Sequence, residues 1–351
     1  MTEASVLTER LTASRLGCLR RCPYEHRLRY ELRLARVEEA PALRFGSAFH
    51  KGQELRNKGM ADVEVLEQIA AEYGPEQPLE REIVTWLLCG HWWYYGESDN
   101  IAEIIEVEQP FDVPLLNPTS GLPSRTFTMA GKMDLLCRLT DGRLAVLDYK
   151  TTSEDISSDS AYWLRLRQDQ QISLYVVAAR RQGYEVDTVM YDVVRKPTIS
   201  PRQIPELDDD GYKIVVDEAT GERVMNKNGG LRQSADSAKG WKMITRTESV
   251  EEFGRRLQQD ISDRPDHYFA RREVPRLDGD LKIFEQELWN EAKVLRQRQL
   301  QHWWTRTVNR WTCGSCAFAD LCLQGIEVRP EDEPPAGYVR LASAHPELDG
   351  E

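Results

Sequence analysis

The 351-residue chain is long enough to bury a sizeable hydrophobic core, as one decorated domain or as two smaller ones. Its residues are 40% hydrophobic and 30% charged, and the absence of any long apolar run excludes a membrane-spanning segment. The formal net charge of −12 argues against a protein that coats nucleic acid indiscriminately. The first residues lack the basic and apolar regions of an export signal, so we expect a cytoplasmic protein.

The charges are distributed unevenly. From Ser14 to Arg36 the chain has seven arginines against two glutamates, whereas from Glu327 to Glu351 it has seven acidic residues against two arginines. The negative average therefore hides a basic segment near the N-terminus.

The first third of the chain has apolar residues at helical spacing. From Thr12 to about Gly96, prolines divide this pattern into several helices. From Ile101 the pattern changes to alternation, in the segments IIEVEQPFDV, FTMAGKMDLLCRL and RLAVLDYKT. Because Asp141-Gly142 between the last two favours a tight hairpin, we predict a meander of three strands.

The segment from Ala161 to Tyr184 contains no proline, and its only glycine is Gly183. We predict one helix here that packs on the sheet, followed by a strand in VDTVMYDVV. The apolar residues that would face the sheet are Leu164, Ile172, Tyr175, Val176 and Ala179.

The second half of the chain alternates between irregular and helical patterns. Turn-rich segments flank short strand-like pieces and predict a hairpin-like insertion, to which we assign no role. The pattern from Glu248 to about Trp304 is helical, with a strand in PDHYFARREVPR, and the acidic, Pro-rich tail is expected to be loosely ordered or draped over the surface. The expected divisions are a helical region 1–100, a core 101–196, the insertion 197–245, a helical and cysteine-containing region 246–325 and the tail 326–351.

Two of the predicted strands contain an aspartate in an apolar setting. In a hairpin that turns at Asp141-Gly142, Asp134 lies near the middle of one strand, while Asp148 and Lys150 share a face of its partner. Two converging carboxylates are costly unless a divalent cation lies between them, and oxygen ligands favour Mg²⁺ or Mn²⁺. Lys150 would then orient water and stabilise charge on a phosphoryl group. The alternative is a surface hairpin with a salt bridge between Asp148 and Lys150.

Five short motifs follow one another in a fixed order from Ser14 to Tyr175. They are Ser14-Arg15-Leu16 with Cys22-Pro23, Gly46-Ser47-Ala48-Phe49-His50, Gly131-x-x-Asp134, Asp148-Tyr149-Lys150 and Gln171-x-x-x-Tyr175. This order resembles the PD-(D/E)XK nuclease superfamily in its RecB-type branch, although Met133 stands where the name of the superfamily places proline. The resemblance implies a restriction-endonuclease-like α/β (α+β) fold: a mixed-sheet core, an N-terminal helical region, and C-terminal helices that close an iron–sulfur site.

The resemblance also implies a role for each motif residue. His50, Asp134, Asp148 and the Tyr149 carbonyl would bind Mg²⁺ or Mn²⁺, and Lys150 would be the catalytic lysine. Gln171 and Tyr175, four residues apart on one helix, would face the site and the DNA backbone.

Three cysteines near the end of the chain form a C-x2-C-x5-C pattern, at Cys313, Cys316 and Cys322. Three thiols this close predict a metal site, which needs a fourth ligand to hold zinc or a 4Fe-4S cluster. Cys18 and Cys22 are both available. Since the iron–sulfur members of this nuclease branch use a cysteine of the N-terminal Cys-Pro region, the resemblance implies Cys22 and a 4Fe-4S cluster, with Zn²⁺ as the alternative.

Cations interleaved with aromatic residues near this cysteine site predict contacts with DNA. The residues selected are Arg15, Arg20, Arg21, Trp303 and Arg306. The resemblance extends to the CRISPR spacer-acquisition nucleases, the AddB nuclease domain and phage exonucleases of this type. It implies a DNA exonuclease that acts at linear or single-stranded ends in phage or prokaryotic recombination or repair. The chain has no helicase P-loop, so it is not itself a motor, and a free-standing nuclease is expected. A recombination or helicase protein is the candidate partner.

Three other functions stay open at this point. One is a catalytically silent DNA-binding or scaffold subunit that has kept the nuclease fold. Another is a CRISPR spacer-acquisition nuclease. The third is a zinc-bearing regulatory protein in which the hairpin with Asp148 and Lys150 is incidental.

Overall fold

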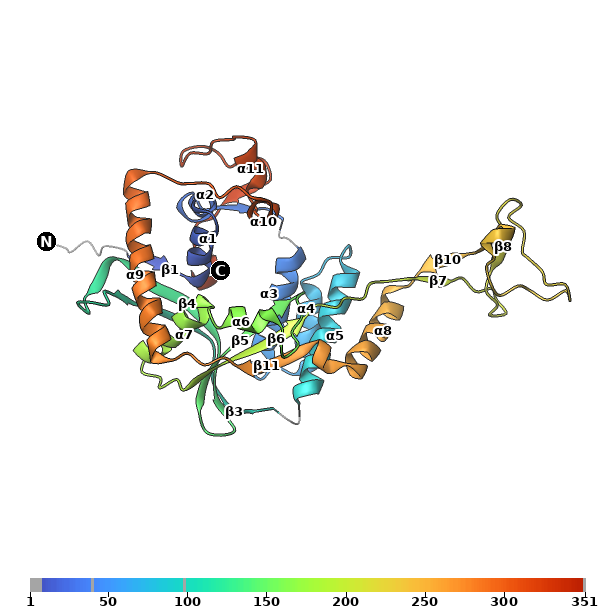
Figure 1. Cartoon of the computed structure of the whole chain (residues 1–351), viewed down its shortest axis with the longest axis horizontal. Coiled ribbons are helices and arrows are strands. Elements are labelled where there is room, and N and C mark those ends of the chain that lie inside the picture. Colours follow the sequence, from blue (N-terminus) through green and yellow to red (C-terminus); the bar gives the residue numbers. More distant parts are fainter. Residues whose placement is uncertain (1–7, 39–40, 97–98, 350–351) are drawn as a thin grey trace.

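A mixed six-stranded sheet forms the centre of the computed structural model, which describes residues 8–38, 41–96 and 99–349 (Figure 1). Its strands follow the order β1-β4-β5-β6-β11, and β3 pairs with β4. The β1/β4 and β5/β6 pairs are parallel, and the other pairs are antiparallel. The strands are β1 Glu9–Leu11, β3 Ile101–Leu116, β4 Pro123–Leu139, β5 Leu144–Thr152, β6 Thr188–Arg195 and β11 Phe269–Glu273. The predicted α/β class with a mixed sheet is confirmed.

The predicted three-strand meander is present as β3, β4 and β5. The turn between β4 and β5 uses Gly142 with a φ of 91°, a conformation that glycine adopts most easily. Leu135 pairs with Leu147 in the antiparallel ladder. Extending this register by one residue places Asp134 beside Asp148.

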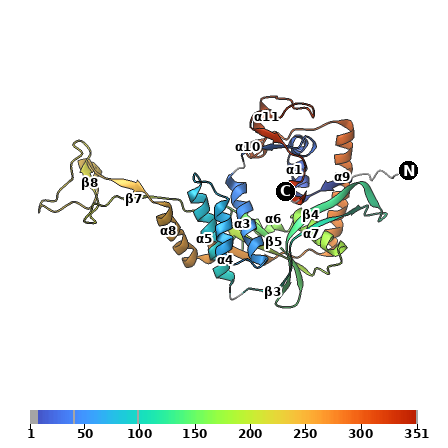
Figure 2. The ribbon, with the colours of Figure 1, turned by 180° about the vertical axis from the view of Figure 1, so that it is seen from behind.

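Helices cover both faces of the sheet, as the two opposite views show (Figures 1 and 2). One face packs against α1 Ala13–Arg21, α6 Ala161–Leu166, α7 Gln170–Arg181 and α9 Asp278–Gln301. The other packs against α3 Pro41–Asn57, α4 Asp62–Ala71, α5 Pro78–Tyr95 and α8 Val250–Asp263. Because β5 lies between these two layers, its residues from Leu144 to Tyr149 are all buried.

The single helix predicted from Ala161 to Tyr184 is wrong, because the chain forms two helices, α6 and α7. The Asp169 side chain accepts a hydrogen bond from the Gln171 backbone and caps α7. The Arg276 guanidinium donates to the carbonyls of Leu166 at 2.6 Å and Asp169 at 3.0 Å, which stabilises the break. Since α6 does not continue the apolar face of α7, Leu164 is exposed rather than packed on the sheet.

The two ends of the chain meet in a separate lobe, which we call the end lobe. Most of its short elements contribute to one apolar cluster that includes Leu28, Leu34 and Phe318. β12 pairs antiparallel with β2, so the acidic tail is draped over this lobe. The elements are α2 Pro23–His26, the π-helix η1 Arg27–Glu31, β2 Leu34–Arg36, α10 Arg310–Gly314, α11 Ala319–Leu323, β12 Tyr338–Arg340 and α12 Pro346–Asp349.

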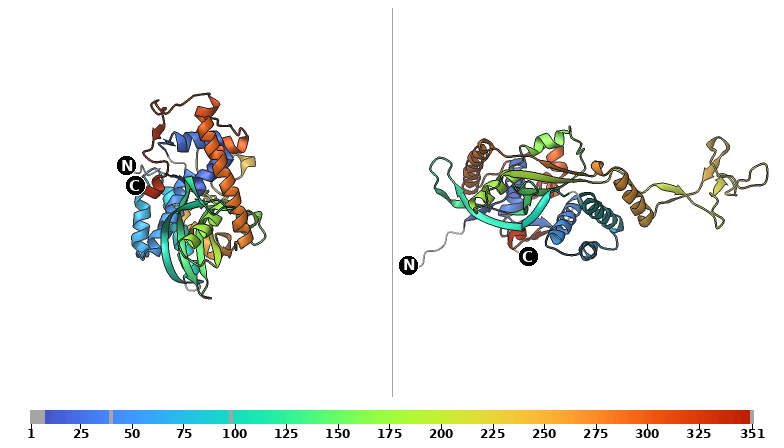
Figure 3. Two further views of the ribbon diagram at one scale, coloured as in Figure 1. Left: turned by 90° about the vertical axis from the view of Figure 1, so that its left-hand side faces the viewer. Right: turned by 90° about the horizontal axis from the view of Figure 1, so that it is seen from below.

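The predicted insertion leaves the body of the molecule as a long arm (Figure 3). β7 Gln203–Pro205 pairs with β10 Thr245–Thr247, and β8 Val215–Asp217 pairs with β9 Trp241–Met243. Short 3-10 turns occur in the arm at η2 Ser237–Lys239 and after α8 at η3 Pro265–His267. Throughout residues 8–38, 41–96 and 99–349, no helix combines the length and the apolar character needed to cross a membrane.

Candidate active site and cysteine pocket

The two strand aspartates meet where β4 and β5 lie side by side. Asp134 accepts a hydrogen bond from the Tyr149 backbone N–H at 2.9 Å. Its Oδ2 atom also lies 3.4 Å from Nδ1 of His50, which comes from α3. Burial lowers the pKa of His50, but the Asp134 carboxylate outweighs this effect and keeps that pKa above its ordinary value. The fold thus gathers His50, Asp134 and Asp148, which are far apart in the sequence.

The glycine of the Gly131-x-x-Asp134 motif has a packing reason. A Cβ atom at Gly131 would lie 2.6 Å from the ring of Phe111, which is buried on the neighbouring strand β3. A larger residue would therefore force the buried Phe111 ring to shift, and glycine lets β3 and β4 pack closely at this position.

Asp148 is fully buried, and its Oδ1 atom has no partner among the described residues. Its Oδ2 atom lies 2.8 Å from the Lys150 Nζ atom, so the Lys150 amine is the cation beside this carboxylate, and the lone pairs of Oδ1 are left free. Burial raises the pKa of Asp148 to about 7. A buried carboxylate with free lone pairs is costly, and a divalent cation would accept them.

The donors around Asp148 therefore suit a hard cation. Two carboxylates and one imidazole are the ligand types that Mg²⁺ and Mn²⁺ accept. In the part of the chain that the structure describes, however, no group of three or more His, Cys, Asp or Glu side chains is arranged so that it could hold a metal ion. Coordination by His50, Asp134, Asp148 and the Tyr149 carbonyl stays a prediction.

Lys150 connects the carboxylates to helix α7. Its amine donates to Oε1 of Gln171 at 2.7 Å, and the Gln171 amide donates to the Tyr175 hydroxyl at 2.7 Å. Burial lowers the pKa of Lys150, but the carboxylates of Asp148 and Asp169 outweigh it, so the pKa lies above its ordinary value and the amine is protonated. The predicted catalytic residues of β5 and α7 thus form one continuous chain of contacts.

Two acidic residues that sequence reasoning missed lie beside this site. Asp169 has its Oδ2 atom 3.7 Å from the Lys150 amine and accepts from the Tyr191 hydroxyl. Glu108 forms an ion pair with Lys132 at 2.8 Å, and burial together with the Asp134 charge raises its pKa. Asp169 precedes a helical segment, which is the usual position of an N-cap residue. Glu108 lies two residues before Pro110, and a proline interrupts the hydrogen bonding of a strand. Both signals were available in the sequence.

A buried polar network on the other face of the sheet holds α3 in place. His91 lies 3.0 Å from both carboxylate oxygens of Asp192, and Arg271 donates to the same carboxylate at 2.8 Å. The His91 ring also accepts from Gln53, which lies one helical turn after His50 on α3. The network therefore positions the helix that supplies His50.

The four cysteines assigned to a cluster line one pocket in the end lobe. Cys22 comes from the start of α2, and Cys313, Cys316 and Cys322 come from α10, α11 and the loop between them. Backbone amides donate to the sulfurs of Cys22 and Cys316 at 3.4 Å. Cys18 is buried but does not line this pocket, and burial raises the pKa of its thiol to about 12.

The predicted DNA-binding arginines near the N-terminus are engaged by acidic residues of the protein. Arg15 is buried and pairs with Glu9 at 2.7 Å and Glu31 at 3.1 Å. Because these contacts use its guanidinium, we do not retain Arg15 among the proposed DNA contacts. Arg20 and Arg21 also form salt bridges with glutamates, but both are exposed and are able to exchange partners.

The two predicted DNA-binding residues of the C-terminal half are exposed. The Arg298 guanidinium lies 4.0 Å from the ring centroid of Trp303, and Arg306 lies 4.0 Å from that of Tyr24. Each therefore belongs to a pair of an aromatic ring and a cation, although Tyr24 itself is buried.

Comparisons with known proteins identify the family. The model of the PD-(D/E)XK nuclease superfamily matches residues 10–323, which contain the sheet, the candidate site and the cysteine pocket. The chain therefore belongs to the PD-(D/E)XK nuclease superfamily, as the motif order implied. Membership indicates a metal-dependent nuclease with DNA as its substrate, and nucleases of this superfamily generally use Mg²⁺ or Mn²⁺.

A solved structure titled "Crystal structure of SSO0001" resembles the chain at 12% sequence identity and a TM-score of 0.34. The match covers 93% of this chain and 90% of the other. No curated protein matches the chain.

Proposed function

We propose that Asp134, Asp148 and Lys150 form the catalytic centre of a metal-dependent deoxyribonuclease. The observation that carries this proposal is the fully buried Asp148 carboxylate, which has only the protonated Lys150 amine beside its Oδ2 atom and no partner for Oδ1 among the described residues. A salt bridge on an exposed hairpin, the alternative reading of the sequence, would not require burial of the carboxylate.

The residues around this centre have distinct roles in the proposal. His50, Asp134, Asp148 and the Tyr149 carbonyl would hold Mg²⁺ or Mn²⁺, which, when bound, supplies a Lewis acid and an activated water. Lys150 donates to the phosphoryl oxygens and stabilises the charge that develops on them. Gln171 keeps the Lys150 amine in place, because its own amide is oriented by the Tyr175 hydroxyl.

We further propose that the chain is an exonuclease acting at DNA ends in phage or prokaryotic recombination or repair. The support is the order of the RecB-type motifs from Ser14 to Tyr175. A spacer-acquisition nuclease has the same motifs and is the second candidate. A catalytically silent subunit is disfavoured, because its sequence would not need to keep Asp134, Asp148, Lys150 and Gln171 in contact.

We also propose that Cys22, Cys313, Cys316 and Cys322 hold a 4Fe-4S cluster. They line one pocket, and amide donors to the sulfurs are a feature that tunes such clusters. A zinc ion held by the same four thiols is the alternative occupant, and iron and zinc analysis of the purified protein distinguishes the two.

Digestion of end-labelled linear and closed circular DNA tests the enzyme proposal. We expect Mg²⁺ or Mn²⁺ to support degradation of the linear DNA and Ca²⁺ to permit binding without efficient turnover, because Ca²⁺ is larger and activates water poorly. Circular DNA should resist an exonuclease. Full activity after exhaustive chelation would exclude a metal-dependent reaction, and equal digestion of the circle would exclude an exonuclease.

The affinity of the site for Mn²⁺ is expected to depend on pH. The pKa of Asp148 is raised to about 7, so below that pH a metal ion must displace a proton from this carboxyl. The Asp148 carboxyl alone should then increase the apparent Kd for Mn²⁺ by up to about tenfold for each pH unit below 7, and His50, whose pKa is also raised, should add to this dependence. Calorimetric titration with Mn²⁺ at several pH values measures this dependence. Asp148→Asn is the control: it should bind Mn²⁺ more weakly, and its Kd should depend less on pH because the carboxyl is gone.

A further inference from the structure

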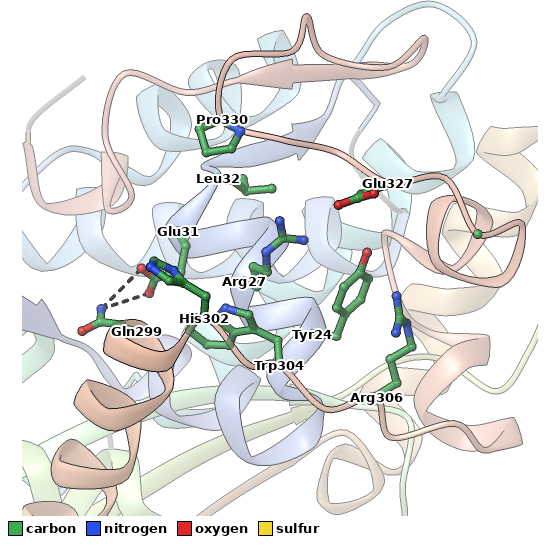
Figure 4. A pocket seen from close by; sticks show the side chains of 11 residues that line it. Tyr24, Arg27, Glu31, Leu32, Gln299, His302, Trp304, Arg306, Glu327 and Pro330 are labelled. Carbon is green, nitrogen blue, oxygen red and sulfur yellow. Dashed lines mark hydrogen bonds between the residues drawn. The ribbon is translucent and has the colours of Figure 1, made fainter.

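A second pocket lies in the end lobe (Figure 4), and its lining shares Tyr24 and Arg306 with the lining of the cysteine pocket. Its volume of about 680 Å³ is in the range of small-molecule sites. The residues that matter for its chemistry are Tyr24, Arg27, Glu31, His302, Trp304 and Arg306. They come from α2 and η1 on one side and from the connection after α9 on the other.

The backbone around this pocket is unusual. Arg27 and Glu31 are the two ends of the π-helix η1, a rare conformation that occurs often at functional sites. His302 has a φ of 52° and Arg33, which follows the lining residue Leu32, has a φ of 55°. The remaining non-glycine residue with positive φ in the described ranges is Glu108, beside the candidate active site. Such conformations persist only where the surrounding structure maintains them.

The acidic residues of the pocket already have basic partners. Glu31 pairs with the buried Arg15 at 3.1 Å and also accepts hydrogen bonds from Gln299. Glu327 lies 3.9 Å from the guanidinium of Arg329. Each of these carboxylates therefore has a basic residue beside it, although Arg15 is shared with Glu9 and the contact between Glu327 and Arg329 is exposed.

The two arginines of the pocket, in contrast, have no carboxylate partner among the described residues. Arg27 donates to the Val328 carbonyl at 3.2 Å, which leaves other guanidinium N–H groups available. Arg27 and Arg306 lie 5.8 Å and 4.0 Å from the ring centroid of the same residue, Tyr24. Arg306 also forms hydrogen bonds with Tyr24 and Cys322, but neither arginine pairs with a carboxylate of the described residues. In a chain with a net charge of −12, two such guanidinium groups attract an anion.

The pocket also offers an aromatic surface. The Trp304 ring stacks on the buried His26 ring at a centroid distance of 5.6 Å, and Trp304 itself is half-buried and lines the pocket. A ring that is supported from behind is a rigid platform for another flat group. Phosphate-binding cations beside such a platform are the combination by which proteins bind single-stranded nucleic acids.

We propose that this pocket binds one nucleotide unit of single-stranded DNA, away from the cleavage site. Arg27 and Arg306 contact its phosphate, and its base stacks on Trp304. A base within a duplex is covered by its neighbours, so the pocket favours an unpaired strand. This inference rests on the proposed function in taking DNA as the substrate, and it adds a preference for single strands.

Binding of a labelled oligo-dT strand to the full-length protein without divalent cations tests the phosphate contacts. Arg27→Gln and Arg306→Gln should each weaken binding and lower the slope of log K against log salt by about 0.7, as expected for one lost phosphate contact on a single strand. Arg33→Gln is the matched control, because it also removes one guanidinium charge. Arg33 does not line the pocket and donates to the Ala342 carbonyl instead. A control variant that loses as much affinity and slope as Arg27→Gln would overturn the proposal.

A second binding experiment tests whether a DNA base stacks on Trp304. Trp304→Leu should weaken binding of oligo-dT by about fivefold or more, in line with the loss of one stacked base. The same variant should bind an abasic strand as the unchanged protein does. Equal losses for both strands would overturn the stacking role, and thermal unfolding shows that the variant is folded. If dTMP or inorganic phosphate competes as well as oligo-dT does, the pocket takes a free anion and the strand proposal is wrong.

Hydrolysis of bis(p-nitrophenyl) phosphate, a diester too short to reach both sites, separates this proposal from the proposed nuclease function. Hydrolysis together with unchanged oligo-dT binding by Arg27→Gln would support the nuclease and overturn the pocket. No hydrolysis together with weakened binding by Arg27→Gln would support the pocket and count against the nuclease.

Discussion

Replacing Asp148 with alanine is expected to abolish DNA cleavage and to leave DNA binding largely intact. The carboxylate is buried next to Asp134 and Lys150, where it acts on the metal and the reacting phosphate rather than on the remote DNA backbone. Lys150→Ala should have the same effect, since the charge on the phosphoryl group would lose its nearest cation. We expect the cleavage rate to fall by about 10³-fold or more in each variant, measured on end-labelled linear DNA.

The matched control for this prediction is Asp141→Ala. Asp141 lies in the turn of the same hairpin, is exposed, and accepts hydrogen bonds from Arg143. The substitution removes the same group from the same β-hairpin, so it should change cleavage little. A purified, nuclease-free Asp148→Ala or Lys150→Ala protein that cleaves at nearly the unchanged rate would show that the catalytic centre lies elsewhere.

The second large effect is expected at Cys22. If Cys22 joins Cys313, Cys316 and Cys322 around a cluster, its loss leaves an incomplete site, and the metal-binding free energy no longer supports the fold. Cys22→Ala should therefore lose both iron and thermal stability. Iron analysis, visible absorbance and thermal unfolding measure the outcome and also distinguish iron from zinc.

Cys18→Ala provides the comparison, because Cys18 lies one helical turn before Cys22 and is also buried. It does not line the cysteine pocket, so its replacement should keep the iron and reduce the free energy of unfolding by only about 1 kcal/mol. If Cys18→Ala loses the iron while Cys22→Ala retains it, the ligand assignment is wrong. If both variants retain it, α1 and α2 contribute no ligand.

The sequence by itself determined the meander of β3, β4 and β5 and the motif residues on it. Alternation and an Asp-Gly turn are local signals, and a two-residue period places Asp148 and Lys150 on one face without reference to the rest of the chain. The assignment of His50, Gln171 and Tyr175 came from the family resemblance, and the structure brings these residues to the same place.

Only the tertiary structure decided which of these groups have partners. Arg276 lies more than one hundred residues after the carbonyls that it caps, and its contacts separate α6 from α7 and place Asp169 beside Lys150. Arg15 lies in a basic segment but is buried and forms ion pairs with Glu9 and Glu31. Arg27 lies in the same segment, and its guanidinium donates to a backbone carbonyl rather than to a carboxylate. Composition and spacing describe neighbours along the chain, and the free energy of a charged group depends on its neighbours in space.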